Sequence, residues 1–150
     1  MSEILDEAGG CTLYQTTPEH VHVTEGASHM ACLQMTPQGP FRWYAGCCST
    51  PFANTASRMG VPFVGVLTAF AKTEAVLPPI AARVHGDGAT GPLPGRKGST
   101  AGAVFGILKR AVGARLRGAH TQTPFFEPSG APVAKPHVLS HEERARAYSA

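Results

Sequence analysis

Glycine and proline recur along the whole chain and limit how far any helix or strand can run. The 150 residues include 17 glycines and 13 prolines, which together make one residue in five. Glycine weakens a helix or strand and proline interrupts its hydrogen bonding, so long helices cannot dominate the fold. Hydrophobic residues still make up 43% of the chain, which is enough for a core and atypical of a disordered protein. We therefore expect one folded domain built from short elements.

The first half of the sequence predicts a sheet. Runs of alternating, β-branched or aromatic residues lie between turn residues, and they occupy residues 20–24, 30–36, 41–44, 61–68 and 80–84. Short strands at this spacing are typical of antiparallel sheets. The predicted fold class is therefore mainly β.

One basic amphipathic helix is predicted after this sheet, over residues 99–117. Ser99 or Thr100 can cap its N-terminus, and Gly118 follows its end. An apolar residue recurs at every fourth position and forms a stripe of Val104, Leu108, Val112 and Leu116. We expect the stripe to cover the sheet, with the cations of the helix in solvent. The alternative is a helix that lies on a membrane or on nucleic acid.

These patterns divide the chain into a sheet domain (residues 1–85), a flexible loop (residues 86–98), and a helix with a proline-rich tail (residues 99–150). Charge follows the same division, with three cations and six acids up to residue 82 and ten cations and four acids from residue 83 on. Two glycine-rich stretches, residues 86–91 and 95–100, resemble nucleotide-binding loops. Both interpretations are rejected, because the first is not followed directly by a helix and the second lacks the required Gly-Lys-Ser/Thr order.

The composition also restricts where the protein acts and what it binds. No run of apolar residues is long enough to span a membrane, and the acidic N-terminus does not resemble a secretory signal. We therefore expect a cytoplasmic protein whose four cysteines are thiols or metal ligands. A net charge of +3 is small for a dedicated nucleic-acid-binding protein, so nucleic acid is not an expected partner.

The most informative segment is residues 41–51, where a predicted strand ends in a tight turn with two adjacent thiols, Cys47 and Cys48. A thiol-bearing turn of this kind is typical of a zinc knuckle. Together with residues 24–26, the segment resembles the C-terminal half of the glutathione-dependent formaldehyde-activating enzyme family, which includes centromere protein V. The resemblance covers about residues 12–85 and points to a divergent bacterial branch of that family.

The motif of that family reads aromatic-Cys-x-x-Cys-Gly-x-Pro. Tyr44 takes the aromatic place, Cys48 the place of the second cysteine, and Ser49 the place of the glycine. The first cysteine falls on Ala45, and Cys47 is an extra neighbour. Nothing in the chain matches the cysteine clusters of the family's N-terminal half. The resemblance therefore implies a β-tent fold that lacks its N-terminal metal-binding half, and it suggests a truncated start.

The resemblance implies a zinc cofactor, with Cys48 and Cys47 as the predicted metal ligands. Adjacent side chains diverge in an extended chain, which makes chelation by both cysteines awkward. A tetrahedral site would need further ligands from Cys11 and Cys32, with His20, His22 and His29 in reserve. Cys32 lies in an apolar run, where a buried inert thiol is expected, and Cys11 stays undecided. His20 and His22 would share one face of a strand, where an ordinary polar face is the simpler interpretation.

The function implied by the resemblance is that of a zinc-dependent carbon–sulfur lyase, which forms or breaks a small thiol–aldehyde adduct. We expect this chain to be inactive alone, because part of the family's metal site has no counterpart in it. The alternative is a non-catalytic binding or regulatory module in which the basic helix, residues 99–117, contacts an acidic partner.

Overall fold

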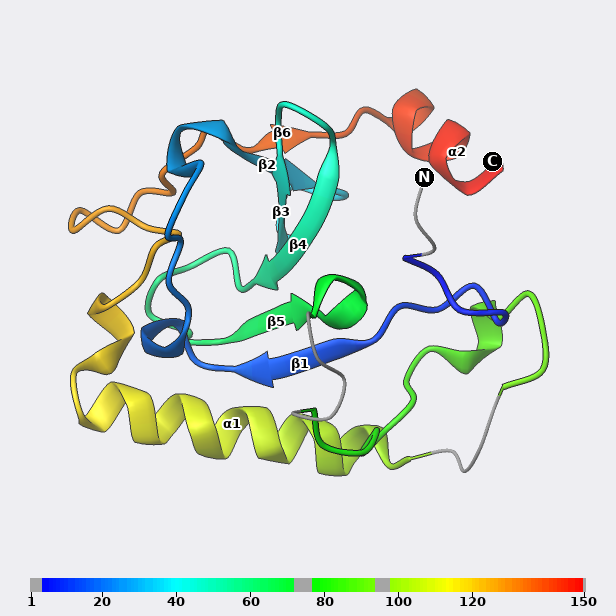
Figure 1. Ribbon diagram of the computed structural model, residues 1–150, viewed down its shortest axis with the longest axis horizontal. Coiled ribbons are helices and arrows are strands. Elements are labelled where there is room, and N and C mark those ends of the chain that lie inside the picture. The colour runs from blue at the N-terminus through cyan, green and yellow to red at the C-terminus, as the bar shows by residue number, and fades with distance from the viewer. Residues whose placement is uncertain (1–3, 72–76, 94–97, 150) are drawn as a thin grey trace.

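The computed structural model describes residues 4–71, 77–93 and 98–149, and these form short strands and two α-helices (Figure 1). The strands are β1 (Leu13–Thr16), β2 (Met30–Gln34), β3 (Phe41–Ala45), β4 (Thr50–Thr55), β5 (Val64–Leu67) and β6 (His137–Val138). The helices are α1 (Thr100–Leu116) and α2 (His141–Ser149).

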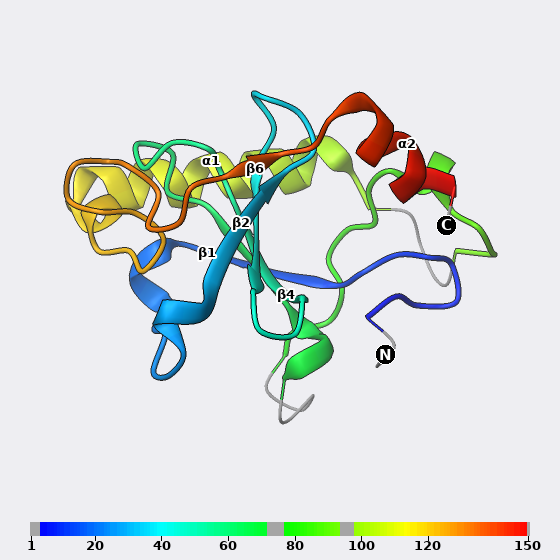
Figure 2. The same ribbon diagram turned by 90° about the horizontal axis from the view of Figure 1, so that it is seen from above.

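The six strands form one sheet in the order β1-β5-β4-β3-β2-β6. All neighbouring strands are antiparallel except β6, which runs parallel to β2 and pairs His137 with Leu33. Figure 2 shows β6 beside β2 on its way to α2. The prediction of a sheet-dominated fold with a basic helix after the sheet is confirmed. The sheet is mixed rather than purely antiparallel, because two residues of the C-terminal tail return to its edge.

The central strands form where the sequence alternates with a period of two. In β3, Phe41 and Trp43 are buried while Arg42 between them is exposed. Cys32 in β2 and Ala53 in β4 are buried opposite Trp43 in the sheet register. Side chains on alternate residues of a strand point to the same face, so these four residues line one side of the sheet.

The C-terminal tail completes this core. Phe125 is fully buried, and its ring centroid lies 5.2 Å from that of Trp43. Phe126 packs beside Phe41 at a centroid distance of 6.0 Å. The indole N–H of Trp43 donates to the Thr55 hydroxyl at 2.9 Å, so the one polar atom of this ring is satisfied. The predicted segments 1–85 and 99–150 therefore contribute to one common core.

Two of the predicted strands do not form. Pro18 begins a 3₁₀ turn (Pro18–His20), so residues 20–24 start at the end of a turn and continue outside the sheet. Residues 80–84 also lie outside the sheet, with Ile80 and Val84 exposed. In their place β1 and β4 pair with β5. The strands expected over residues 30–36, 41–44 and 61–68 are present with shorter or slightly shifted bounds as β2, β3 and β5.

The predicted helix and its caps are confirmed. The Gly102 N–H donates to the Ser99 hydroxyl at 3.2 Å, which is an N-cap hydrogen bond. After α1, Gly118 has a φ of 71°, a left-handed conformation that glycine adopts without strain and that ends helices. The second helix, α2, begins with a capping box, because Ser140 and Glu143 each accept a hydrogen bond from the other's backbone N–H.

The apolar stripe of α1 does not cover the sheet, which corrects the prediction made from its spacing. Val104, Leu108 and Val112 are 47%, 56% and 58% exposed, and Leu116 is 83% exposed. The helix lies beside β1, at the opposite edge of the sheet from β6 (Figure 1). It packs there through the side that carries Ala114, which is fully buried, and Ile107, which is half-buried. The side expected to face the sheet therefore faces outward.

The predicted flexible loop of residues 86–98 is described in part. It begins with a 3₁₀ turn (Gly86–Gly88), and the Thr90 N–H donates to the Ala8 carbonyl at 3.0 Å, which ties this part of the loop to the N-terminal segment. Residues 94–97 of the predicted loop lie outside the described residues. None of the helices in the described ranges is long and apolar enough to cross a membrane.

Candidate functional site

Both predicted metal ligands lie in the turn between β3 and β4, which we call the dithiol turn (residues 46–49). The backbone N–H groups of Cys48 and Ser49 donate to the Ala45 carbonyl at 3.2 and 2.7 Å, and the Gly46 N–H donates to the His29 carbonyl at 2.7 Å. Ser49 has a φ of 57°, in the left-handed region that favours glycine. Glycine is the residue at this place in the motif that the sequence resembles. The turn is thus held by backbone hydrogen bonds.

The turn brings the two thiols together. The Sγ atoms of Cys47 and Cys48 lie 3.8 Å apart, and the Cys48 Sγ lies 3.1 Å from the Thr50 hydroxyl oxygen. Both cysteines are exposed. The expectation that their side chains diverge was based on an extended chain, and it is wrong because the chain turns sharply at this point.

The two thiols have different acidities. The hydroxyl and the backbone of Thr50 form hydrogen bonds with the Cys48 sulfur, and the Cys47 thiol forms another. Together these hydrogen bonds lower the pKa of Cys48 below its ordinary value. Donation of its S–H to Cys48 raises the pKa of Cys47. Hydrogen bonds to the charged form of a group favour that form, so Cys48 ionises first and Cys47 keeps its proton. The turn therefore presents two neighbouring thiols, of which Cys48 is the more acidic.

The dithiol turn fits part of a zinc site. Zinc–thiolate bonds of about 2.3 Å in a tetrahedral site place two sulfurs about 3.8 Å apart. The observed Sγ–Sγ separation of 3.8 Å matches this geometry. Among the residues that the structure describes, however, no group of three His, Cys, Asp or Glu side chains is placed to hold a metal ion. Cys47 and Cys48 supply half of a tetrahedral ligand set, and the described residues do not complete it.

The remaining cysteines lie apart from the dithiol turn. Cys32 is 2% exposed in β2, and burial raises the pKa of its thiol to about 11. The prediction that Cys32 is buried is therefore confirmed, and the raised pKa favours an unreactive thiol. Cys11 is exposed in the segment before β1.

The reserve histidines do not gather around the cysteines. His20 ends the Pro18–His20 turn, and its imidazole Nε2 lies 3.8 Å from the Glu19 carboxylate. His22 is exposed in a segment that is not a strand, so the shared strand face expected for His20 and His22 is absent. Only His29 touches the dithiol turn, through its backbone carbonyl.

A buried carboxylate that the sequence did not indicate lies where the C-terminus of α1 meets the Pro18–His20 turn. The Glu19 side chain is 10% exposed, and its Oε1 lies 3.2 Å from the Arg117 guanidinium. Burial alone would raise the pKa of Glu19, but hydrogen bonds with its own backbone, Thr17 and Arg117, together with the His20 charge, lower it. Glu19 and Arg117 are far apart in sequence, so no local pattern could have revealed this pair. It fixes the end of α1.

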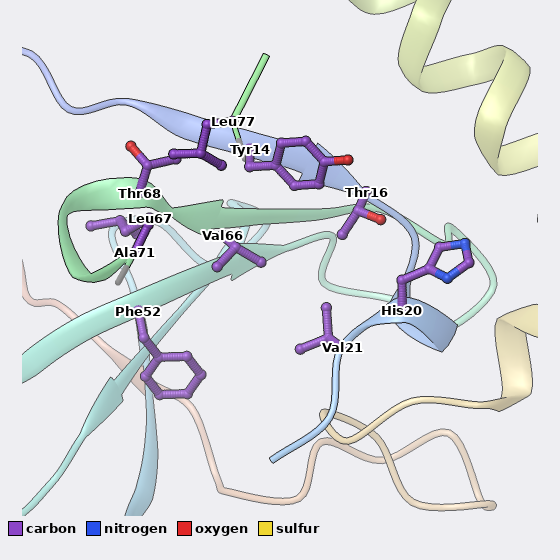
Figure 3. Close-up of a pocket in the computed structure, with 10 residues that line it drawn as sticks. All are labelled: Tyr14, Thr16, His20, Val21, Phe52, Val66, Leu67, Thr68, Ala71 and Leu77. Carbon is purple, nitrogen blue, oxygen red and sulfur yellow. The ribbon is translucent and has the colours of Figure 1, made fainter. Parts of the chain in front are cut away.

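A shallow groove of about 540 Å³ lies over β1, β5 and β4 (Figure 3). Its walls are mainly apolar, with Phe52, Val66 and Leu67 among them, and Tyr14 and His20 add polar atoms on the β1 side. Neither thiol of the dithiol turn is among the described residues that line it. The groove and the thiol pair are therefore separate features.

The comparisons with known proteins identify a family without assigning a function. No curated protein and no solved structure matches the chain. One family model matches residues 2–137, which include the whole sheet core, the dithiol turn and α1. The chain therefore belongs to the Family of unknown function (DUF6151).

Proposed function

We propose that the dithiol turn forms and releases adducts between a thiol and a small aldehyde, which is carbon–sulfur bond chemistry. The observation that carries the proposal is the exposed pair of Cys47 and Cys48, with sulfurs 3.8 Å apart on a turn held by backbone hydrogen bonds. The opposite directions of their pKa shifts support it, because neighbouring groups with separated acidities are suited to act as a nucleophile and a proton donor.

The step uses only these two side chains and the aldehyde. The Cys48 thiolate attacks the carbonyl carbon and forms the carbon–sulfur bond, and the carbonyl π electrons move to the oxygen. Cys47 then gives its proton to that oxygen, which leaves a hydroxyalkyl thioether on Cys48 and a thiolate on Cys47. Reversal of the same proton and electron movements releases the aldehyde.

Zinc remains part of the proposal as a cofactor whose remaining ligands would come from outside the described residues. Cys47 and Cys48 would hold it as thiolates, and zinc bound there would supply Lewis-acid polarisation of a carbonyl group in place of the Cys47 proton. The dithiol turn is exposed, so the described residues around it do not exclude water from an adduct. We therefore expect the chain alone to form the adduct reversibly and to turn it over slowly.

The test is addition of ¹³C-labelled formaldehyde to the reduced protein, followed by NMR of the labelled carbon. We expect an S-hydroxymethyl signal that is lost in Cys48→Ser and kept in Cys11→Ser, a matched control at another exposed thiol. In Cys47→Ser the signal should form more slowly, by about 100-fold, because positioned proton donors contribute about that factor. A signal that survives unchanged in Cys48→Ser contradicts the proposal.

Alkylation by iodoacetamide as a function of pH checks the assignment of the two roles. Only the thiolate reacts, so a lowered pKa shifts the reaction profile to lower pH. Peptide mass spectrometry should place the midpoint for Cys48 below pH 9.0 and that for Cys47 above it, because 9.0 is the ordinary thiol value from which the two depart in opposite directions. The reverse order of midpoints would contradict the assignment of Cys48 as the nucleophile and Cys47 as the proton donor.

A further inference from the structure

Helix α1 turns a continuous apolar surface away from the rest of the described chain. We call this surface the outer face of α1, and it consists of Val104, Phe105, Leu108, Val112 and Leu116. Phe105 is 69% exposed and Leu116 is 83% exposed. Scattered exposed apolar residues are common on proteins, but a contiguous set along one helix marks an interaction surface.

The orientation of the helix is fixed by contacts on its other side. The Arg110 guanidinium donates to the Gln15 side chain at 3.0 Å, and the Arg115 guanidinium donates to the Gly60 carbonyl at 2.8 Å. Arg117 pairs with Glu19, and Ala114 is fully buried. With these contacts in place, α1 cannot roll to hide the outer face without breaking hydrogen bonds at both its middle and its end.

Helix α1 carries positive charge and no acid of its own. No Asp or Glu occurs between Asp87 and Glu127 in the sequence. Lys109 lies four residues after Phe105 and three before Val112, so it borders the outer face, and Arg115 lies three residues after Val112. Neither cation forms an ion pair with an acid within the described part of the chain. Charge complementarity therefore favours a negatively charged occupant.

A second copy of this chain would not offer the negative charge that the outer face favours. Packing two outer faces against each other would bring Lys109 and Arg115 of both copies together, with no acid on either helix to balance them. The shape of the outer face also favours a flat, extended occupant. Helix α1 lies at an edge of the molecule (Figure 1), and its outer face is about 18 Å long. A long face at an edge is free to meet a flat surface along its whole length.

From these observations we infer that the outer face of α1 docks on an anionic lipid surface. The five apolar side chains enter the boundary between headgroups and acyl chains, as in interfacial amphipathic helices. Lys109 extends to the negatively charged headgroups, while the Arg115 guanidinium stays at the Gly60 carbonyl and adds only its charge. Both charges give an electrostatic attraction that salt weakens. This inference is independent of the thiol chemistry, because the outer face and the dithiol turn share no residue.

The test is co-sedimentation of the full chain with vesicles made of equal parts of phosphatidylcholine and phosphatidylserine. We expect binding to these vesicles, weak binding to pure phosphatidylcholine, and release at high salt. Phe105→Ser should lower the partition coefficient by about tenfold or more, because insertion of an aromatic side chain contributes at least that factor. Lys109→Glu should lower it by about tenfold through the change in charge.

Matched controls lie away from α1. Val133→Ser removes an exposed valine and Lys135→Glu reverses an exposed cation, both in the tail before β6, and neither should change the partition coefficient. Circular dichroism and thermal unfolding establish that Phe105→Ser and Lys109→Glu keep the fold. Equal losses of vesicle binding in the α1 variants and the control variants would overturn the inference. They would indicate nonspecific electrostatic or hydrophobic adsorption of the whole protein.

Three other outcomes would also overturn it. The first is an absence of binding to the anionic vesicles by the folded protein. The second is a dimer in analytical ultracentrifugation that Phe105→Ser dissociates, which would assign the outer face to a second copy. The third is binding to duplex DNA that equals vesicle binding and is unaffected by Phe105→Ser, which would assign the cations alone to nucleic acid.

Discussion

Strand β3 and helix α1 are both amphipathic, and they use this property in opposite ways. In β3 the apolar residues Phe41 and Trp43 are buried, and Arg42 is exposed. In α1 the apolar stripe and Phe105 are exposed, Ile107 is half-buried, and the buried position is Ala114. An amphipathic pattern thus shows that two faces exist, but it does not say which face contacts the rest of the chain. In α1 the choice depends on arginine contacts and small residues that let the helix approach the edge of the sheet.

The largest effect is expected in the sheet core. Trp43→Ala should lower the free energy of unfolding by about 3–5 kcal/mol, because it leaves a cavity beside Phe125 and removes the hydrogen bond to Thr55. Urea denaturation followed by circular dichroism measures this change. Arg42→Ala, at an exposed position of the same strand, is the control and should have little effect. A loss under about 1 kcal/mol in Trp43→Ala would show that the core of the sheet is not where stability resides.

The second-largest effect on stability is expected for substitutions on the buried side of α1. Ala114→Leu adds a large side chain at a position with no exposed surface, and overpacking of this kind costs about 1–3 kcal/mol. Val112→Leu adds one carbon at a position that is 58% exposed, so its unfolding midpoint should hardly move. If the two substitutions have equal effects, α1 does not dock through the side that carries Ala114.

The smallest effect is expected on the exposed side of the same helix. Leu108 is 56% exposed, so Leu108→Ala should change the free energy of unfolding by less than about 0.5 kcal/mol. The covering role predicted from the spacing alone would instead require a loss of about 2–5 kcal/mol, the usual cost of truncating a buried leucine. The measured value therefore decides directly which side of α1 stabilises the fold.

Local patterns in the sequence predict much of the fold. Apolar and aromatic runs next to turn residues locate β2 and β3, and the capping residue Ser99 with Gly118 bounds α1 closely. Strand β4 was not predicted because it contains Pro51 and its pairing with β3 is irregular, with a register shift between Trp43 and Tyr44. The alternation in residues 20–24 is misleading because Pro18 begins a turn there. These errors arise where backbone geometry, rather than side-chain pattern, decides the structure.

The candidate site is predictable in its residues but not in its geometry. Cys47 and Cys48 stand out in the sequence, whereas their 3.8 Å separation depends on a turn that places Ser49 at a positive φ. The Glu19–Arg117 pair and the outward rotation of α1 depend on contacts between residues far apart in the chain. Such contacts exist only after the sheet has assembled, so a reading of neighbouring residues cannot supply them.

The position of Phe125 has a consequence for how the chain folds. The strands of the core occupy residues 13–67, but the ring that closes the core against Trp43 comes from far downstream. A chain emerging from the ribosome therefore exposes the indole until the tail has been made and has folded back. Such distant contacts are entropically costly to close, which slows folding and leaves the nascent sheet dependent on protection from aggregation.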